Sequence, residues 1–259
     1  MKKKKAILFT VILVLCIVIL SSCAADTEGT AGEEEEGVLS ELIGSRSQSL
    51  QLVGLLTILS LAPSILIMMS GFVRIVIVFS FTRNALGLQQ MPPNQVIVVL
   101  ALFVTFFVMA PTYTQIMDNA IEPYIAEEIT FEEAQEAAEA PIREFMLANT
   151  RRADLNMFIG FLGEEEVAEI ETLDDVPMTT VIPAFLTSEL KTAMVIGFFI
   201  YIPFIVIDMV VASTLMAMGM MMLPPVTISL PFKVLLFILI DGWSLTMQTL
   251  ISGFNVPGG

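Results

Sequence analysis

The stretch from Val181 to Leu223 reads VIPAFLTSELKTAMVIGFFIYIPFIVIDMVVASTLMAMGMMML, and its only charged residues are Glu189, Lys191 and Asp208. A single helix over this range would be about 65 Å long at 1.5 Å per residue, roughly twice the thickness of the hydrocarbon core of a bilayer. The stretch is therefore expected to bend, break or fold back. Pro203 lies in its interior, where it removes a backbone hydrogen bond, so the sequence predicts a broken helix here that packs against protein.

The composition of the whole chain is that of a membrane protein. Of its 259 residues, 56% are hydrophobic and 15% are charged, whereas soluble domains usually carry about 25% charged residues. The formal net charge of -15 disfavours nucleic acid as a partner, because binding a polyanion requires Lys and Arg. The sequence has no histidine and two cysteines, so zinc sites and His-dependent nucleophilic triads lack their usual groups. We expect a protein that is not an enzyme and that uses no cofactor or metal.

The N-terminus has the pattern of a secretory signal peptide. Four lysines follow Met1, then an apolar run from Ala6 to Leu20 and several small residues, so residues 1–24 are predicted to be the signal peptide. We favour ordinary signal peptidase cleavage, but the residues that end in Cys23 also resemble a lipobox, in which Cys23 would be acylated. Residues 25–49 form an acidic leader that is expected to remain solvated.

Residues 50–117 are predicted to form a helical membrane hairpin. The first apolar block, Leu50 to Phe81, is long enough to cross a bilayer, and the second, Val96 to Ala110, is closed by Pro111. Arg83 lies in the connection between the two blocks. Because basic residues are concentrated in cytoplasmic loops, this connection is expected to face the cytoplasm.

Residues 118–178 form an acidic insert that is predicted to be extracytoplasmic. The insert holds 17 of the 27 acidic residues and three bases, one of which is Arg143. Apolar residues recur in it at steps of three and four, which predicts a small helical element with one packed face. Residues 131–150 are predicted to form one or two helices, with Pro141 acceptable only in a first turn.

Charged residues within apolar blocks form the first set of candidate functional residues. Residues 179–259 are predicted to be a broken-helix membrane and pore region, whose last block contains Lys233 and Asp241. A charge at bilayer depth is costly unless it faces protein, water or a partner charge. Each is therefore expected to pair with another helix or subunit, with interfacial snorkelling and ion or proton translocation as alternatives. The set comprises Glu189, Lys191, Asp208, Lys233 and Asp241.

A methionine-rich turn is the second candidate. Five of the 17 methionines lie between Met216 and Met222, beside Gly219 and ahead of Pro224 and Pro225, which stop a helix. Methionine-rich stretches ordinarily fill irregular gaps in a core. In a turn, however, deformable thioether side chains suit a seal that closes tightly and opens around different polypeptides.

Long motifs along residues 50–255 resemble one protein family. They are RNALG at 83–87, QMPPNQ at 90–95, PIREFM at 141–146, IPAFLTSELKTA at 182–193, IPF at 202–204, ASTLM at 212–216, GMMM at 219–222, LPFK at 230–233 and DGW at 241–243. In this order they resemble the FliP family of flagellar biosynthesis proteins, which includes the homologous R protein of virulence type III injectisomes. The acidic run from Glu164 to Asp175 departs from the family pattern.

The resemblance implies a core subunit of the flagellar type III export gate. It implies an all-α integral membrane fold, in which bent helical hairpins from several copies assemble into a ring-like channel in the bacterial inner membrane, within the flagellar basal body. The implied partners are further copies of this chain, FliQ, FliR, FlhB, FlhA and the exported unfolded flagellar proteins. The implied pore seal is Met218, Met220, Met221 and Met222. Charged positions at subunit contacts would be Arg143, Glu189, Lys191, Asp208 and Lys233.

Three alternatives to a flagellar gate subunit remain open from the sequence. The signal peptide favours the flagellar over the injectisome branch of the family. An ion-coupled secondary transporter would place its site at Asp208 and Asp241, beside a broken helix. A membrane-anchored lipoprotein with an acidic sensing domain would carry a lipid on Cys23. The sequence contains no nucleotide-binding loop of the G-x-x-x-x-G-K-[ST] type.

Overall fold

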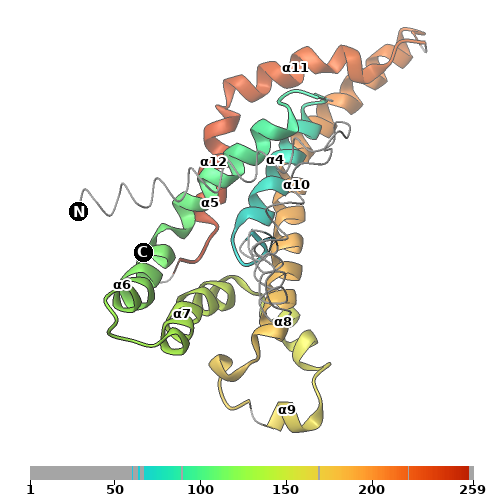
Figure 1. The fold of residues 1–259 in the computed structure, drawn as a ribbon. Coiled ribbons are helices and arrows are strands. Elements are labelled where there is room, and N and C mark those ends of the chain that lie inside the picture. The colour runs from blue at the N-terminus through green and yellow to red at the C-terminus, as the bar shows by residue number, and fades with distance from the viewer. Residues whose placement is uncertain are drawn as a thin grey trace, which may run out of the picture. The chain divides into compact units, whose positions relative to one another are not determined.

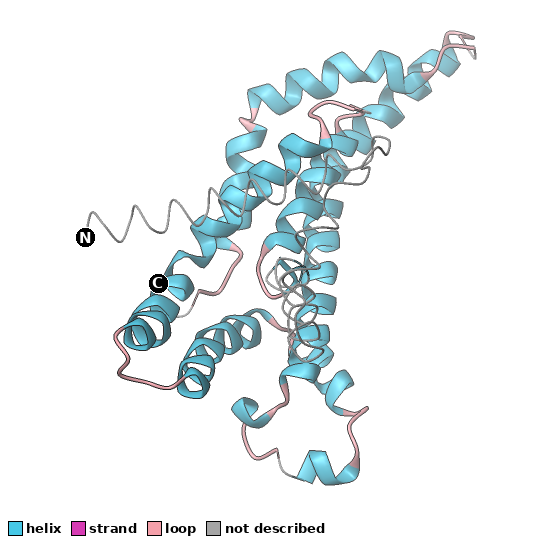
Figure 2. Ribbon diagram, viewed as in Figure 1, coloured by secondary structure: helices cyan, strands magenta, loops and turns pink. Residues whose placement is uncertain are grey.

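A computed structural model describes residues 60, 64, 67–88, 90–168, 170–220 and 222–256. The predicted signal peptide, the acidic leader and the beginning of the first apolar block lie outside these residues. The chain divides into two compact units, Met1–Leu66 and Ile67–Gly259. Within the described part of the second unit, every regular element is a helix and none is a strand (Figure 2).

The helices of the second unit fall into two groups, an elongated group that contains the longest helices and a smaller group of helices at one end of it (Figure 1). Helices α4, α5, α10 and α11 make the long group, and α7 to α9 lie at one end of it. The bounds are α4 (Phe72–Ala85), α5 (Asn94–Ile116), the π-helical turn η1 (Met117–Ile121), α6 (Glu122–Ile125), α7 (Phe131–Asn149), α8 (Arg152–Ile159), α9 (Glu164–Ala168), the 3-10 turn η2 (Leu173–Asp175), α10 (Met178–Ala217), α11 (Pro225–Leu239) and α12 (Gly242–Ser252).

One apolar core joins the membrane-type helices to the acidic segment. Ile75 and Phe79 of α4, Phe145 of α7, Phe185 of α10 and Leu250 of α12 are all fully buried in the same cluster. The rings of Phe145 and Phe185 meet edge to face with centroids 6.0 Å apart. Burying each such side chain contributes about 1.5–3 kcal/mol. The predicted acidic insert is therefore built onto the apolar helices and shares their core.

Helix α5 continues past Pro111, so the prediction that this residue closes the second block is wrong. The helix runs to Ile116 and then through η1 and α6 to Ile125. Met109, two residues before Pro111, and Thr112, directly after it, are both buried. Proline already has a helical φ, and in apolar helices the carbonyl that it leaves free is tolerated when neighbouring segments pack around it.

Helix α10 is continuous over 40 residues, so the predicted break at Pro203 is also wrong. Its length at 1.5 Å per residue is about 60 Å. Pro203 is exposed, whereas the next residue, Phe204, is buried in a small cluster with the end of α4 and with Phe237 of α11. The proline ring thus lies on the outer side of the helix, where it costs a hydrogen bond but displaces no packed neighbour.

Helix α7 is one helix with Pro141 in its interior, which corrects the expectation that Pro141 must begin a helix. A capping box begins α7: Thr130 Oγ1 accepts from the backbone N–H of Glu133 at 3.3 Å, and Glu133 Oε2 accepts from the backbone N–H of Thr130 at 2.8 Å. The hydrogen bonds from the backbone and hydroxyl of Thr130 lower the pKa of Glu133.

The break in the last apolar block lies between α11 and α12, which meet at 61°. Asp241 adopts a left-handed backbone with φ of 48°. A Cβ on the next residue, Gly242, would lie 2.2 Å from the ring of Phe237, so the turn requires glycine there. By length and hydropathy, two helices of the described residues, Asn94–Ile125 and Met178–Ala217, could cross a membrane, and the bent pair could form a third crossing.

Candidate functional site

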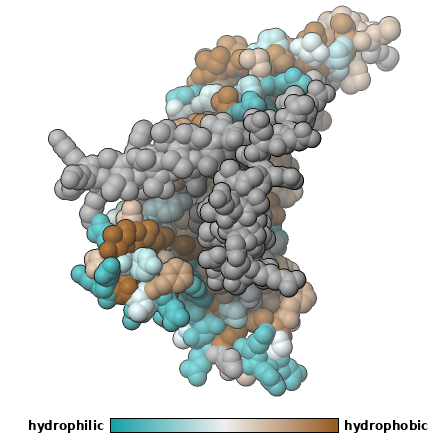
Figure 3. Space-filling model, in the orientation of Figure 1, coloured by the Kyte–Doolittle hydropathy of each residue, from teal (hydrophilic) through white to brown (hydrophobic). Residues whose placement is uncertain are grey.

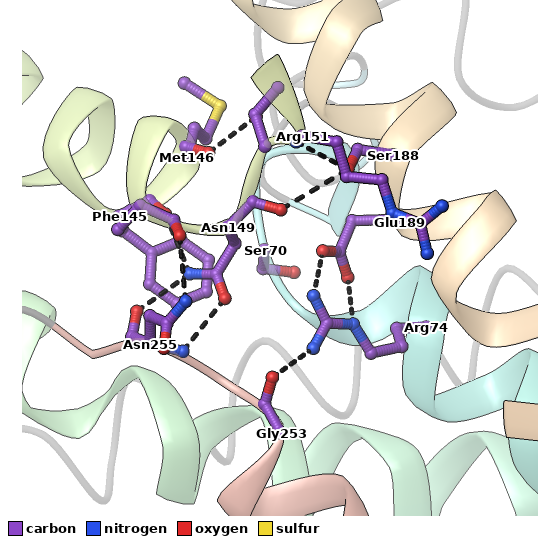
Figure 4. Close-up of polar contacts among 12 residues, drawn as sticks. Ser70, Arg74, Phe145, Met146, Asn149, Arg151, Ser188, Glu189, Gly253 and Asn255 are labelled. Carbon is purple, nitrogen blue, oxygen red and sulfur yellow. Dashed lines mark hydrogen bonds and ion pairs between the residues drawn. The ribbon is translucent and has the colours of Figure 1, made fainter. Parts of the chain in front are cut away.

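Among the described residues, the most buried ion pair joins Arg74 of α4 to Glu189 of α10 (Figure 4). Arg74 Nε donates to Glu189 Oε2 at 2.8 Å, and Arg74 Nη2 donates to Glu189 Oε1. Arg74 Nη1 donates to the carbonyl of Gly253 at 2.7 Å, and the guanidinium carbon lies 4.0 Å from the ring centroid of Phe254. Glu189 has no exposed surface and Arg74 is 2% exposed. Both charges are therefore matched within one chain.

A polar network beside this pair holds the end of α7 (Figure 4). Asn149 donates to the carbonyl of Asn255 at 2.8 Å and accepts from its backbone N–H at 3.0 Å. The Ser188 hydroxyl accepts from the backbone N–H of Arg151 at 2.9 Å. The network connects α7, the beginning of α8, the first third of α10 and the segment after α12. These contacts fix α7 and α8 against the apolar helices.

Lys191, two residues after Glu189, forms an ion pair with Asp154 of α8. The Asp154 carboxyl group is buried, and its Oδ2 has no hydrogen-bond partner among the described residues, whereas the Lys191 side chain is 49% exposed. The amine therefore reaches inward from the surface to a buried acid.

Arg143 of α7 fixes the segment that leads into α10. Its Nη2 lies 2.6 Å from Glu139 Oε1, one turn earlier, and its Nη1 donates to the carbonyls of Asp174 and Val176. Hydrogen bonds from the hydroxyl and backbone of Thr172 lower the pKa of Asp175, the next acid of this segment. Arg143 thus makes its contacts inside the chain.

Asp208 and Lys233 form an ion pair between α10 and α11. Lys233 Nζ lies 2.6 Å from Asp208 Oδ2, and the hydroxyl of Ser229 donates to Asp208 Oδ1 at 2.5 Å. Lys233 is 2% exposed and Ser229 is fully buried. The ion pair and the hydrogen bond from Ser229 both connect α10 to α11, two otherwise apolar helices.

A chain reversal joins α10 to α11 and carries the methionine cluster. Gly219 has φ of 75°, and α11 begins after Pro224. The thioether side chains of Met218 and Met222 are 63% and 98% exposed, and Met220 is 38% exposed. Met221 lies outside the described residues. The methionines thus occupy the exposed tip of a helical hairpin.

Asp241 differs from the other charged candidates. It is exposed at the α11–α12 break, and none of the ion pairs found in the described part of the chain includes it. The described residues also contain no group of three or more His, Cys, Asp or Glu side chains that could hold a metal ion.

Apolar surface surrounds these sites. Only 11% of the most apolar 18-residue stretch of α10 is buried. Near its end, an apolar groove runs between α10 and α11, lined by Val206, Val210, Leu215, Ile228 and Phe232, among others. Figure 3 shows hydrophilic residues at the end that carries α8 and α9 and hydrophobic residues over the α11 end. The long helices are therefore suited to contact lipid or further protein.

Comparison with known proteins fixes the family. The family model described as the FliP family matches residues 55–250. The chain belongs to the FliP family. The Bacillus subtilis (strain 168) flagellar biosynthetic protein FliP is 55% identical over 208 residues, which cover 80% of this chain and 93% of that relative. FliP of Caulobacter vibrioides is 49% identical, covering 83% of this chain and 80% of the relative, and FliP of Aquifex aeolicus is 47% identical, covering 82% and 88%.

The structure of this FliP-family chain also supplies partners that the sequence did not reveal. Arg74, Asp154 and Ser229 are not among the candidate residues predicted from the sequence. Their partners lie 115, 37 and 21 positions away in the chain, so no local spacing indicated these pairs. The only available signal was the need to neutralise charges at bilayer depth.

Proposed function

We propose that this chain is a core channel subunit of the flagellar type III protein export gate, needed for secretion of flagellar proteins and for flagellum assembly. Membership of the FliP family over residues 55–250 carries the proposal. In this proposal, several copies assemble with FliQ and FliR homologues in the bacterial inner membrane. FlhB and FlhA homologues lie beside the assembly, and unfolded flagellar proteins pass through it.

The apolar surface that the single chain leaves exposed favours an assembly of several chains over a membrane protein that acts alone. Helix α10 is about twice as long as a bilayer requires, and it remains continuous, with its most apolar stretch largely uncovered in the single chain. The portion in excess of the hydrocarbon thickness needs protein neighbours to remove it from water. Other copies and partner subunits would provide them.

The exposed methionine hairpin supports the proposed seal. Met218, Met220 and Met222 lie at a reversal that little of the chain covers. Brought together from several copies, unbranched thioether side chains would fill a central opening and adapt to a passing polypeptide. Arg143, Glu189, Lys191, Asp208 and Lys233 would support this tip by fixing the helices behind it, and Asp241 would set the bend of the last pair.

Secretion in a strain that lacks its own FliP tests the proposal. Expression of this chain should restore export of hook protein and flagellin, and FliQ and FliR homologues should co-purify with it. Deletion of Met220 to Met222 should keep the assembly but let small solutes leak. Restored secretion with an unchanged barrier in the deletion variant would refute the seal, and failure to restore secretion or co-purify partners would refute the gate.

The transporter alternative is separated by a flux assay. A secondary transporter with a site at Asp208 would carry solute or protons when the purified chain alone is reconstituted, and Asp208→Asn would abolish that flux. The gate proposal expects no flux from the chain alone. In the structure, Asp208 is already held by Lys233 and Ser229.

A further inference from the structure

The methionines of the turn between α10 and α11 are exposed residues, with Met222 98% and Met218 63% exposed. We propose that Met218, Met220 and Met222 are a site of methionine sulfoxide formation by hydrogen peroxide or hypochlorous acid, and that this oxidation converts an apolar seal into a polar one. The modification itself rests on exposure alone. Its effect on the seal rests on the proposed function.

Exposure separates these methionines from others in the same chain. Met222 is 98% exposed and Met218 is 63% exposed, whereas Met109 and Met146 are 2% and 0% exposed in the core. At Gly219, in the centre of the turn, even an added Cβ would meet no atom within 4 Å. Because the rate of methionine oxidation follows access of the oxidant to sulfur, the turn should react before the core.

The turn differs from single exposed methionines because several methionines lie close together in its sequence. Met91, in the connection between α4 and α5, is 71% exposed but has no neighbouring methionine in the sequence. Met194 and Met209 are exposed on the apolar span of α10, but no other methionine lies within six positions of either in the sequence. Among the described residues, the turn alone brings several exposed methionines together in the sequence, so oxidation there changes the polarity of a whole surface.

The chemistry needs only the oxidant and water. The thioether sulfur attacks one oxygen of hydrogen peroxide, a sulfur–oxygen bond forms and the O–O bond breaks. The hydroxide that leaves takes the proton from the new sulfur-bound hydroxyl group and becomes water. Sulfur loses two electrons, and the peroxide is reduced by two electrons. Methionine sulfoxide reductases, which use a reductant, can return the thioether.

Sulfoxides oppose a seal made of thioethers. Each adds a strong hydrogen-bond acceptor, and burial of an unpartnered polar group is unfavourable. Hydrophobic constrictions close by excluding water, so polar groups at the constriction favour a hydrated, conducting state. Each copy in an assembly would contribute its own sulfoxides, so the number of polar groups around the opening would rise with the number of copies.

Mass spectrometry of the assembled complex tests the modification. The intact complex is treated with graded hydrogen peroxide and oxidation is followed at each methionine. Met222 should be oxidised at least tenfold faster than Met146, and Met91 reports the rate of an exposed methionine outside the cluster. A rate at Met222 no greater than that at Met146 would overturn the assignment.

A permeability assay tests the consequence. Membranes that contain the complete gate should leak a small fluorescent solute at least tenfold faster after oxidation, and added methionine sulfoxide reductases should reverse the leak. The variant Met218→Leu/Met220→Leu/Met221→Leu/Met222→Leu keeps the turn apolar, and its leucines cannot form sulfoxides. The permeability of this variant should not rise on oxidation, whatever its starting value; an oxidation-induced rise equal to that of the parent gate would overturn the proposed switch.

The two proposals fail in different ways. If the untreated Met220–Met222 deletion does not leak, the seal itself is refuted, whatever the oxidation rates. If the deletion leaks but full sulfoxide formation at the turn leaves permeability unchanged, the seal stands and the oxidative switch is refuted.

Discussion

Arg74 and Glu189 form a bidentate ion pair with two hydrogen bonds, although 115 positions separate them in the chain. The pair joins α4 to α10, and the third bond of Arg74, to Gly253, adds the segment after α12. Glu189 is fully buried within the single chain. A role for Glu189 in subunit contact would therefore require this pair to open or to be shared with a neighbour.

Removal of one member of this pair should be strongly destabilising. Glu189→Gln leaves the Arg74 guanidinium buried without a balancing charge, and such changes cost about 3–5 kcal/mol. The expected result is a loss of that size in the unfolding free energy of the detergent-solubilised protein. Glu165→Gln on the exposed surface of α9 is the matched control and should change stability by less than about 0.5 kcal/mol.

The double variant Arg74→Met/Glu189→Met separates charge from packing. Replacing both partners of a buried pair by apolar groups is often close to neutral. The double variant should therefore be more stable than Glu189→Gln. A double variant as unstable as the single one would show that the contacts with Gly253 and Phe254, not charge balance, dominate at this site.

Asp208→Asn should destabilise the α10–α11 hairpin more than Ser229→Ala. The first change leaves the buried ammonium of Lys233 without its carboxylate and should cost about 3–5 kcal/mol, whereas loss of one hydroxyl hydrogen bond costs about 1 kcal/mol. Hydrogen exchange across residues 205–235 measures both. Equal protection in the two variants would contradict a structural role for the ion pair.

The pattern of apolar blocks predicted helices well but located their interruptions poorly. The sequence predicts a stop at Pro111, a helix start at Pro141 and a break at Pro203, yet all three prolines lie inside continuous helices. The real break, at Asp241 and Gly242, depends on a left-handed residue and on Phe237 packing against a glycine. Those are tertiary constraints, and apolar periodicity does not encode them. The methionine turn was found because Gly219 and the paired prolines are local signals.

A methyl group at Gly197 should disturb the contact between α4 and α10. A Cβ there would lie 2.6 Å from the ring of Phe81, so the helices must separate or the ring must move. Gly197→Ala is expected to cost about 1–3 kcal/mol, as overpacking does. Gly163→Ala is the control, because a Cβ there meets nothing within 4 Å. Thermal unfolding should rank the two, and comparable midpoints would contradict this close approach.

The capping box of α7 predicts a pH effect. The hydrogen bonds from Thr130 lower the pKa of Glu133 in the folded chain, so the carboxylate contributes stability above its unfolded pKa of about 4.3. This contribution is lost as pH falls through the lower, folded value. Amide exchange in the first turn of α7 should therefore rise in acid. Glu133→Gln should remove that part of the pH dependence, and an unchanged profile would argue against the box.

Asp241 could act through its backbone conformation or through its charge, and substitutions separate these two roles. Its φ of 48° disfavours most side chains, a cost of roughly 1–2 kcal/mol that glycine avoids and that Asn and Asp tolerate best. Since its carboxylate is exposed, we expect a backbone role: Asp241→Gly and Asp241→Asn should secrete flagellin within about threefold of the parent chain, and Asp241→Val should fail because a β-branched residue resists this conformation. Quantitative flagellin secretion in a complemented strain measures all three. Equal loss with Gly and Asn would instead establish that the charge is required, as an ion pair between subunits demands.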